Sequence, residues 1–414
     1  MSSADQPDIY VASFNDVHAW GGGVAAANGL AEACRRRGLR PLILGVSPRA
    51  AATPISWRHA DRLNVAVGTL PVIWRVQSWR VTEVLRRFLR RLPPPRVAFV
   101  GNSPFWVVAA KRTWPQVRVV YRFPCLLSNC LPFTWAHRKP PTFWERVNFA
   151  GVSRAETLAL RLADLTLVAT HANLEEVAAF CPSVRDRLAQ CHFGCQTFAI
   201  NDALRVRHRR ELELDDDAFL VAAVGVCDRN KACDHAIREL LYVHHRARLA
   251  IVGDGPQRAD WQQLAAKCGV AERVRFVGPQ RDMGPWYAAA DCVISASFYD
   301  AYPNTIREAI SCGRPVVVPR HDPPHVHAGI AELVARERCG LLYDRQCPGE
   351  LGERLNRLVN DPRGAEALGR RGREVAMRLF RWDECVNQTV GDVVSAAQRS
   401  PDPPPAELCE TPTS

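Results

Sequence analysis

The stretch of sequence that decides the fold is CVISASFYDAYPNTIREAISCGRPVVV, residues 292–318. Its apolar runs at Cys292–Ala296 and Pro315–Val318 are typical of buried strands. Between them, Pro303 suits the start of a helix, because its φ is already helical and its missing N–H would be unbonded there anyway. Gly313 suits the position just past a helix end. The stretch therefore predicts a strand, a loop, a helix and a second strand.

The same alternation extends upstream of this stretch. Strands are expected at Phe219–Val224, Leu249–Val252 and Val274–Val277, with helical segments between them. Strands that alternate with helices predict a mostly parallel sheet that helices cover on both faces. The preceding segment, Asn201–Asp217, is charged and has no apolar periodicity, so it is interpreted as an inter-domain linker.

The N-terminal half opens with a similar unit. An apolar run at Ile9–Phe14 is followed by a loop with Gly21, Gly22 and Gly23, and then by a helical stretch that Gly38 ends. Further strands are expected at residues 41–44, 97–100, 117–121 and 165–169. Together the two series predict an α/β protein with two Rossmann-like domains.

The expected boundaries divide the chain into four parts. An N-terminal domain spans residues 1–203 and a C-terminal domain spans residues 204–380. A helix over residues 381–399 follows, and the proline-rich residues 400–414 are expected to be a disordered tail. A length of 414 residues accommodates two domains of ordinary size.

Composition indicates a globular protein rather than a membrane-spanning or disulfide-rich one. Hydrophobic residues make up 47% of the chain and charged residues 23%. No apolar stretch reaches the roughly 18 uncharged residues that a spanning helix needs. The polar, acidic start at Met1–Pro7 is unlike a secretory signal, so we expect a cytoplasmic protein. The 15 cysteines form no Cys-x-x-Cys pair, so neither a disulfide framework nor a zinc site is expected.

The formal net charge of +11 gathers partly in arginine clusters at residues 35–37, 86–91 and 205–210. Such clusters can attract anionic lipids or phosphorylated substrates, or can simply be a solvated surface. Leu85, Phe88, Leu89 and Leu92 recur at helical spacing among arginines. They predict either a basic helix on an anionic membrane face or a helix packed on the sheet. Nucleic-acid binding is not expected, because no aromatic residues alternate with the basic ones.

In each half of the chain, a glycine-bearing loop follows the first strand. In the first, the triplet Gly21–Gly23 lets the backbone approach a phosphate at a helix N-terminus, although a tight structural turn explains it equally well. It is not the Gly-x-Gly-x-x-Gly fingerprint of nicotinamide and flavin proteins. In the second, Gly225, Arg229 and Lys231 lie where ligands bind in parallel sheets. The two cations can hold a diphosphate there or can be ordinary solvated side chains.

Two carboxylates flank the helix predicted in the opening stretch. Asp300 lies in the loop before that helix and Glu308 lies on it. A helix N-terminus offers N–H groups to a diphosphate, and a neighbouring carboxylate can accept hydrogen bonds from sugar or ribose hydroxyls.

The second half resembles the retaining glycosyltransferases of family 4, which have the GT-B fold of two Rossmann-like domains facing a cleft. Asp300 and Glu308 stand at the two positions of the family's Glu-x7-Glu pattern. Supporting matches, in the expected order, are Pro303, Asn304, Ala309, Gly313, Pro315–Val317 and the segments 251–256, 274–278, 289–291 and 380–383. The likeness covers residues 218–397 well and the N-terminal half more loosely.

This resemblance implies roles for individual residues. Glu308 would bind the ribose of a nucleoside diphosphate-sugar, Asp300 the sugar hydroxyls and Lys231 the diphosphate. Further donor-binding candidates, several through the backbone, are Gly22, Gly23, Gly225, Arg229, Asn304 and Thr305. No metal-binding carboxylate motif is present, so no metal or other cofactor is expected.

The chain departs from the family pattern at three positions. Asp300 is one methylene shorter than the usual glutamate, and Val226 replaces the arginine that usually precedes the phosphate lysine. Pro124 replaces a histidine near the reacting sugar, where Arg122 or His137 would have to contribute instead.

The sequence therefore predicts a retaining glycosyltransferase of the hexosyltransferase type that transfers a sugar to an acceptor hydroxyl. We expect a role in cell-surface polysaccharide or glycolipid synthesis, with peripheral contact to the anionic inner membrane face. The alternatives are a soluble small-molecule acceptor and a non-catalytic protein that binds sugar nucleotides.

Overall fold

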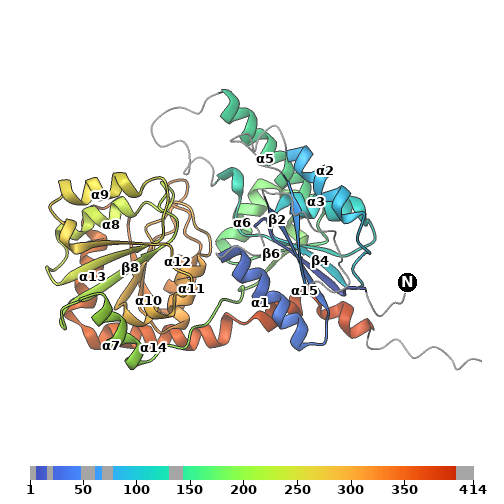
Figure 1. Cartoon of the computed structure of the whole chain (residues 1–414). Helices are drawn as coiled ribbons and strands as arrows, with labels where there is room; N and C mark the ends of the chain where they lie inside the picture. The colour runs from blue at the N-terminus through green and yellow to red at the C-terminus, as the bar shows by residue number, and fades with distance from the viewer. Residues whose placement is uncertain (1–5, 16–21, 48–60, 68–77, 130–142, 398–414) are drawn as a thin grey trace, which may run out of the picture.

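A computed structural model describes residues 6–15, 22–47, 61–67, 78–129 and 143–397. Two α/β domains lie side by side, and each is built on one parallel sheet (Figure 1). The expected tail at residues 400–414 and the candidate His137 lie outside the described residues. The expected α/β class with two Rossmann-like domains is confirmed.

The N-terminal sheet has seven parallel strands. In spatial order they are β3 (Arg62–Ala66), β2 (Pro41–Ser47), β1 (Ile9–Ala12), β4 (Ala98–Gly101), β5 (Val119–Arg122), β6 (Leu165–Val168) and β7 (Leu188–Gln190). The helices that accompany them are α1 (Gly22–Arg36), α2 (Ser78–Leu89), α3 (Pro104–Thr113), α5 (Phe143–Leu162) and α6 (His171–Phe180). Ile9 pairs with Pro41 of β2 and with Ala98 of β4. The strand order therefore reverses at β1, which is where doubly wound sheets bind ligands.

The C-terminal sheet repeats this topology with six strands. Their spatial order is β10 (Val274–Gly278), β9 (Ala247–Val252), β8 (Phe219–Val224), β11 (Cys292–Ile294), β12 (Val316–Pro319) and β13 (Gly340–Tyr343). Its helices are α7 (Asp202–Glu211), α8 (Cys233–Glu239), α9 (Arg258–Lys267), α10 (Gly284–Ala289), α11 (Asn304–Ser311), α12 (Ile330–Glu337), α13 (Glu350–Asn360) and α14 (Pro362–Leu379). The order reverses at β8, so the loop after β8 and the N-terminus of α11 meet at one edge of the sheet.

The chain crosses between the domains twice. The first crossover runs from β7 to α7, and the second lies between α14 and α15 (Trp382–Ala397). Helix α14 packs on α11 in the C-terminal domain, whereas α15 packs on α1 in the N-terminal domain (Figure 1).

Residues 201–217, interpreted from the sequence as an inter-domain linker, contain a helix. Residues Asp202–Glu211 form α7. Asn201 caps this helix, because its side chain accepts a hydrogen bond from the Leu204 N–H at 2.8 Å. The helix has no buried side chain of its own, and ion pairs hold it in place. Arg205 and Arg209 both bind the carboxylate of Asp291, so part of this arginine cluster is structural.

The amphipathic segment around α2 packs against protein. Leu85, Phe88, Leu89 and Leu92 are at most 6% exposed and belong to the core of the N-terminal domain. Of the two interpretations of this segment, the structure supports the packed helix, because its apolar face is not available to a bilayer. Among the described residues, no helix has the length and apolar character to cross a membrane.

Candidate active site

A cleft of about 830 Å³ lies between the two domains. Its C-terminal wall is formed by the carboxyl ends of β8, β9 and β10, together with the start of α11. Its N-terminal wall is formed by one face of α1 from Gly22 to Glu32, and Trp382 of the second crossover completes the lining. Both topological switch points therefore open into the same space.

The N-termini of two helices meet across this cleft. Helix α1 begins at Gly22 and α11 begins at Asn304. A Cβ added to Gly22 would lie 2.3 Å from Nδ2 of Asn304, so the Gly22 backbone lies directly against that amide. Gly22 and Asn304 line the cleft, as does Thr305. Since the first N–H groups of a helix have no intrahelical partner, this place favours an anion.

Glycine residues bring the backbone close to the cleft on the C-terminal side. Gly225 and Gly253 have φ values of +153° and +144°, which favour glycine. A Cβ at Gly253 would lie 1.9 Å from the carbonyl oxygen of Gly225, so any side chain there would force the two loops apart. Gly225 lines the cleft as the sequence suggested, whereas Gly23 faces Asn15 and Ser13 instead.

Glu308 is the buried carboxylate of the cleft. It lies on α11 one turn beyond Asn304, is 8% exposed and lines the cleft. The Tyr287 hydroxyl donates a hydrogen bond to its Oε2 at 2.8 Å. Burial raises the pKa of Glu308 above its ordinary value, and the Tyr287 hydrogen bond and Arg307 oppose this shift. The side chain therefore offers its second oxygen as an acceptor at the cleft surface.

Lys231 and Asp300 form an ion pair with each other. They lie beside a smaller hollow that shares Val224 and Thr305 with the main cleft, and they are not among the residues that line the main cleft itself. Burial lowers the pKa of Lys231, but the neighbouring Asp300 carboxylate outweighs burial, and the net pKa is raised. The ammonium group is therefore charged and sits next to the cleft.

The pair is held in place by a backbone clamp. The buried side chain of Asn230 donates to the carbonyl of Tyr299 and accepts from its N–H, both at 2.9 Å. The carbonyl of Asn230 accepts a further bond from the N–H of Phe298. The loop that carries Lys231 is thus fixed to the loop that carries Asp300.

Of the positions that depart from the family pattern, Val226 lines the cleft, Asp300 lies beside the smaller hollow and Pro124 lines neither. Val226 is 54% exposed at the cleft rim, and Arg229 is half-buried but is not among the lining residues. Pro124 is exposed. The Arg122 guanidinium lies over the rings of Phe193 and Trp382, at 4.4 and 5.7 Å, so it serves the inter-domain packing.

Arg307 is a residue that sequence reasoning missed. It is 1% exposed and donates hydrogen bonds to the carbonyls of Phe193 and Gly194, at 2.6 and 2.8 Å, and to Oδ1 of Asn304. Its guanidinium also lies over the Tyr302 ring. An arginine one position before Glu308 gives no local signal of burial, because its partners come from the first crossover.

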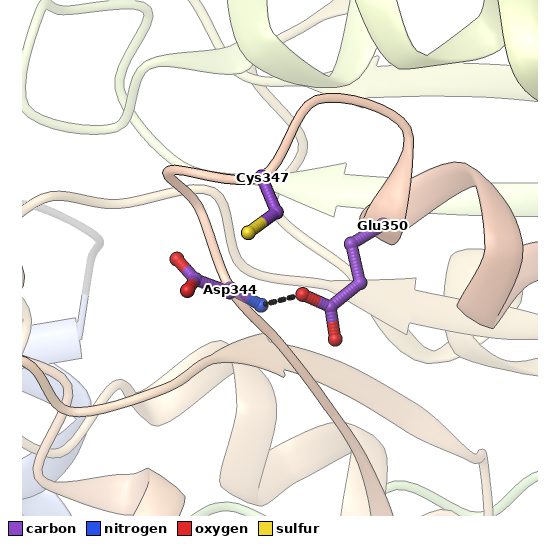
Figure 2. Close-up of side chains that lie close together, drawn as sticks. All are labelled: Asp344, Cys347 and Glu350. Atoms are coloured by element: carbon purple, nitrogen blue, oxygen red, sulfur yellow. Dashed lines mark hydrogen bonds between the residues drawn. The ribbon is translucent and has the colours of Figure 1, made fainter.

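One group of potential metal ligands converges among the described residues, namely Asp344, Cys347 and Glu350 (Figure 2). Glu350 Oε2 accepts the N–H of Asp344 at 2.8 Å, and its Oε1 accepts a hydrogen bond from Arg354. Both carboxylate oxygens therefore already have donors. The group does not line the cleft, and nothing at it requires a cation.

Comparisons with known proteins agree with this geometry. Residues 218–361 match the family described as glycosyl transferases group 1. A D-inositol 3-phosphate glycosyltransferase of Salinispora tropica is 30% identical over 225 residues, which cover 51% of this chain and 42% of that protein. The lipopolysaccharide core biosynthesis glycosyltransferase LpsD of Rhizobium meliloti is 28% identical over 172 residues, covering 42% and 48% of the two chains. The matches thus span about half the length of these relatives.

Solved structures match along nearly the whole chain. Sucrose-phosphate synthase from Thermosynechococcus elongatus superposes with a TM-score of 0.74 at 21% identity, covering 96% of this chain and all of that one. Anabaena HepE, solved in complex with UDP, superposes with a TM-score of 0.69 at 18% identity, covering 94% and 99%. At these identities the likeness concerns the fold. The chain therefore has the GT-B fold, and residues 218–361 of its C-terminal domain match the glycosyl transferases group 1 family.

Proposed function

We propose that this chain is a retaining glycosyltransferase that moves a hexose from a nucleoside diphosphate donor to an acceptor hydroxyl. The observation that carries the proposal is the meeting of two helix N-termini, at Gly22 and Asn304, beside the buried carboxylate of Glu308. A nucleoside diphosphate-sugar carries an anionic diphosphate and two ribose hydroxyls. The helix N-termini offer N–H donors to the diphosphate, and the Glu308 carboxylate offers an acceptor to the ribose hydroxyls.

The diphosphate is assigned to the space between the two helices. Peptide N–H groups of α1 and α11 would donate to its oxygens, and the ammonium of Lys231 would add a positive charge from the adjoining hollow. A diphosphate oxygen competes with Asp300 for Lys231, and Asp300 released in this way can accept hydrogen bonds from the sugar hydroxyls. The ion pair would then exchange partners when the donor binds.

Stabilisation of the negative charge on the leaving diphosphate would accelerate the transfer. As the bond between the sugar and the diphosphate breaks, negative charge grows on the leaving group, where fixed N–H dipoles and Lys231 stabilise it. In a retaining transfer the leaving diphosphate takes the proton of the acceptor hydroxyl on the face that it has just left. This route uses no protein nucleophile, and we propose that it uses no divalent ion, so EDTA should leave the rate unchanged.

For the acceptor we propose a precursor of a cell-surface polysaccharide or glycolipid, made in the cytoplasm at the inner membrane face. The name of the LpsD relative and the arginine clusters of the N-terminal domain support this choice. A soluble small-molecule acceptor is the second candidate, because the apolar face of α2 is buried in the core and is not free to bind a bilayer.

A thermal-shift screen with UDP, GDP, ADP, dTDP and their common sugars tests the donor assignment. A ligand at about 100 times its Kd stabilises the folded protein by roughly 2.7 kcal/mol, which gives a clear rise in Tm. One selective nucleotide shift supports the site, and no shift with any of them contradicts it. A shift without sugar transfer to any acceptor would favour a non-catalytic sugar-nucleotide-binding protein. Sedimentation with anionic vesicles, reversible by salt, separates the two acceptor classes.

A further inference from the structure

Two buried thiols face each other where the chain crosses between the domains. Cys191 follows β7, and Cys385 lies in the first turn of α15, 194 residues later in the sequence. Their sulfur atoms are 3.6 Å apart, and both residues are at most 1% exposed. Both are free thiols in the structure.

The surroundings of this pair are cationic. The Arg122 guanidinium lies within the same aromatic packing, over Phe193 at 4.4 Å. Its Nε is buried without a hydrogen-bond partner, and among the described residues no carboxylate forms an ion pair with it. Arg122 is half-buried, and its positive charge favours the ionised form of the Cys385 thiol.

The two thiols are joined by a hydrogen bond in which the Cys191 thiol donates to the Cys385 sulfur, while the Cys385 thiol lies 3.6 Å from the carbonyl oxygen of His192. The hydrogen bond from Cys191 lowers the pKa of Cys385, with burial acting in the opposite direction. Arg122 and the N–H of Gly194 contribute further lowering. Thiolates rather than thiols react with oxidants, so Cys385 is the sulfur that we expect to attack an oxidant first.

A covalent bond between these thiols would join the two crossovers. Trp382, three residues before Cys385, lines the cleft, and its indole ring lies against Gly194, three residues after Cys191. A Cβ at Gly194 would lie 2.3 Å from that ring. The bond would therefore fasten α15 to the end of β7, beside the points where both crossovers leave the N-terminal domain.

We propose that Cys191 and Cys385 are a redox modification site, at which a hydroperoxide converts the two thiols into a disulfide that fastens α15 to the first crossover. The Cys385 thiolate attacks one peroxide oxygen, which gives a sulfenic acid and releases water or an alcohol after protonation. The Cys191 thiol then attacks the sulfenic sulfur, the S–S bond forms, and water leaves. Two thiols are oxidised by two electrons and one peroxide is reduced.

Mass spectrometry of the full chain tests this site. The reduced protein is treated with hydrogen peroxide, remaining thiols are blocked with iodoacetamide, and the protein is digested with trypsin. Cys191 lies in peptide 188–205 and Cys385 in peptide 382–399, as the arginine positions dictate. We expect these two peptides to appear joined after oxidation and to separate on reduction. The oxidised protein should also unfold at a higher Tm than the reduced protein, because the disulfide closes a long loop.

Matched variants identify the sulfur atoms. Peptide 188–205 also contains Cys195, whose thiol contacts the Ser311 hydroxyl, so Cys195→Ser should keep the link while Cys191→Ser and Cys385→Ser should lose it. The exposed Cys347 reports that the oxidant has acted. Oxidation of Cys347 without the link overturns the proposal, and so does a link that survives Cys191→Ser. No step uses turnover, so the result is independent of the proposed transferase activity.

Discussion

Replacing Glu308 with glutamine tests the assignment of the cleft most directly. Glutamine keeps the size of the side chain and an oxygen that can accept the Tyr287 hydrogen bond, now 2.8 Å long. It removes the negative charge and replaces the second oxygen, an acceptor, with an NH2 donor. Any change in turnover therefore reports the carboxylate and not a cavity or a lost packing contact.

The expected loss of activity follows from the difference in strength between hydrogen bonds to ionised and to neutral groups. A hydrogen bond to an ionised group contributes about 1.5–3 kcal/mol, whereas a neutral one contributes about 0.5–1.5 kcal/mol. Glu308→Gln therefore costs at least about 1 kcal/mol for each ribose hydroxyl that the carboxylate binds, because the amide offers at best a neutral acceptor. For a diol the total is at least about 2 kcal/mol, which is a fall of roughly 30-fold or more in kcat/KM for the donor.

The stability of the Glu308→Gln variant, unlike its activity, should not fall. Burial raises the folded-state pKa of Glu308 above its ordinary value of 4.5. Between the unfolded and folded pKa values the folded state holds more protons, so the free energy of unfolding falls as the pH rises through that window. At pH 7 the ionised carboxylate thus costs stability, and glutamine removes the cost. Glu308→Gln should have a Tm equal to or above that of the wild type.

Steady-state kinetics with the donor found in the thermal-shift screen, and calorimetry at pH 7, measure the two effects. Glu374→Gln, the same change at an exposed position on α14, serves as the control and should alter neither quantity. Wild-type kcat/KM within about threefold in Glu308→Gln would refute the assignment of this carboxylate to the donor.

Four further substitutions have defined outcomes. Gly22→Val should weaken nucleotide binding at least tenfold by isothermal titration with little change in Tm, because its Cβ would lie 2.3 Å from the Asn304 amide; unchanged binding would contradict the helix-terminus site. Lys231→Met should lower both donor binding and Tm, since it leaves Asp300 half-buried without its cation. Adding Asp300→Asn should restore the Tm but not the activity, and restored activity would argue against a role for Lys231. Burial raises the pKa of the fully buried Glu156 from 4.5 to about 7. The free energy of unfolding should therefore fall by roughly 2–4 kcal/mol as the pH rises between these two values. In urea titrations, Glu156→Gln should make this fall smaller.

Local pattern predicted the elements around the site closely. Pro303 and Gly313 bracket α11, which runs from Asn304 to Ser311, because the constraints that they impose act on their own backbone. The same reasoning placed Glu308 and Asn304 on the helix that faces the cleft. It gave no helix at residues 201–217, since α7 has no buried side chain and therefore no apolar periodicity to detect.

The sequence by itself determined the alternation of strands and helices, the two-domain α/β class and the family resemblance of residues 218–397. These properties depend on side-chain periodicity and on motifs within a few turns of chain. Only the tertiary structure decided that Lys231 pairs with Asp300, that Arg307 reaches the first crossover and that Cys191 meets Cys385. These partners are 69, 114 and 194 residues apart. Contacts at such separations are set by how the sheets and crossovers pack, and no local propensity records them.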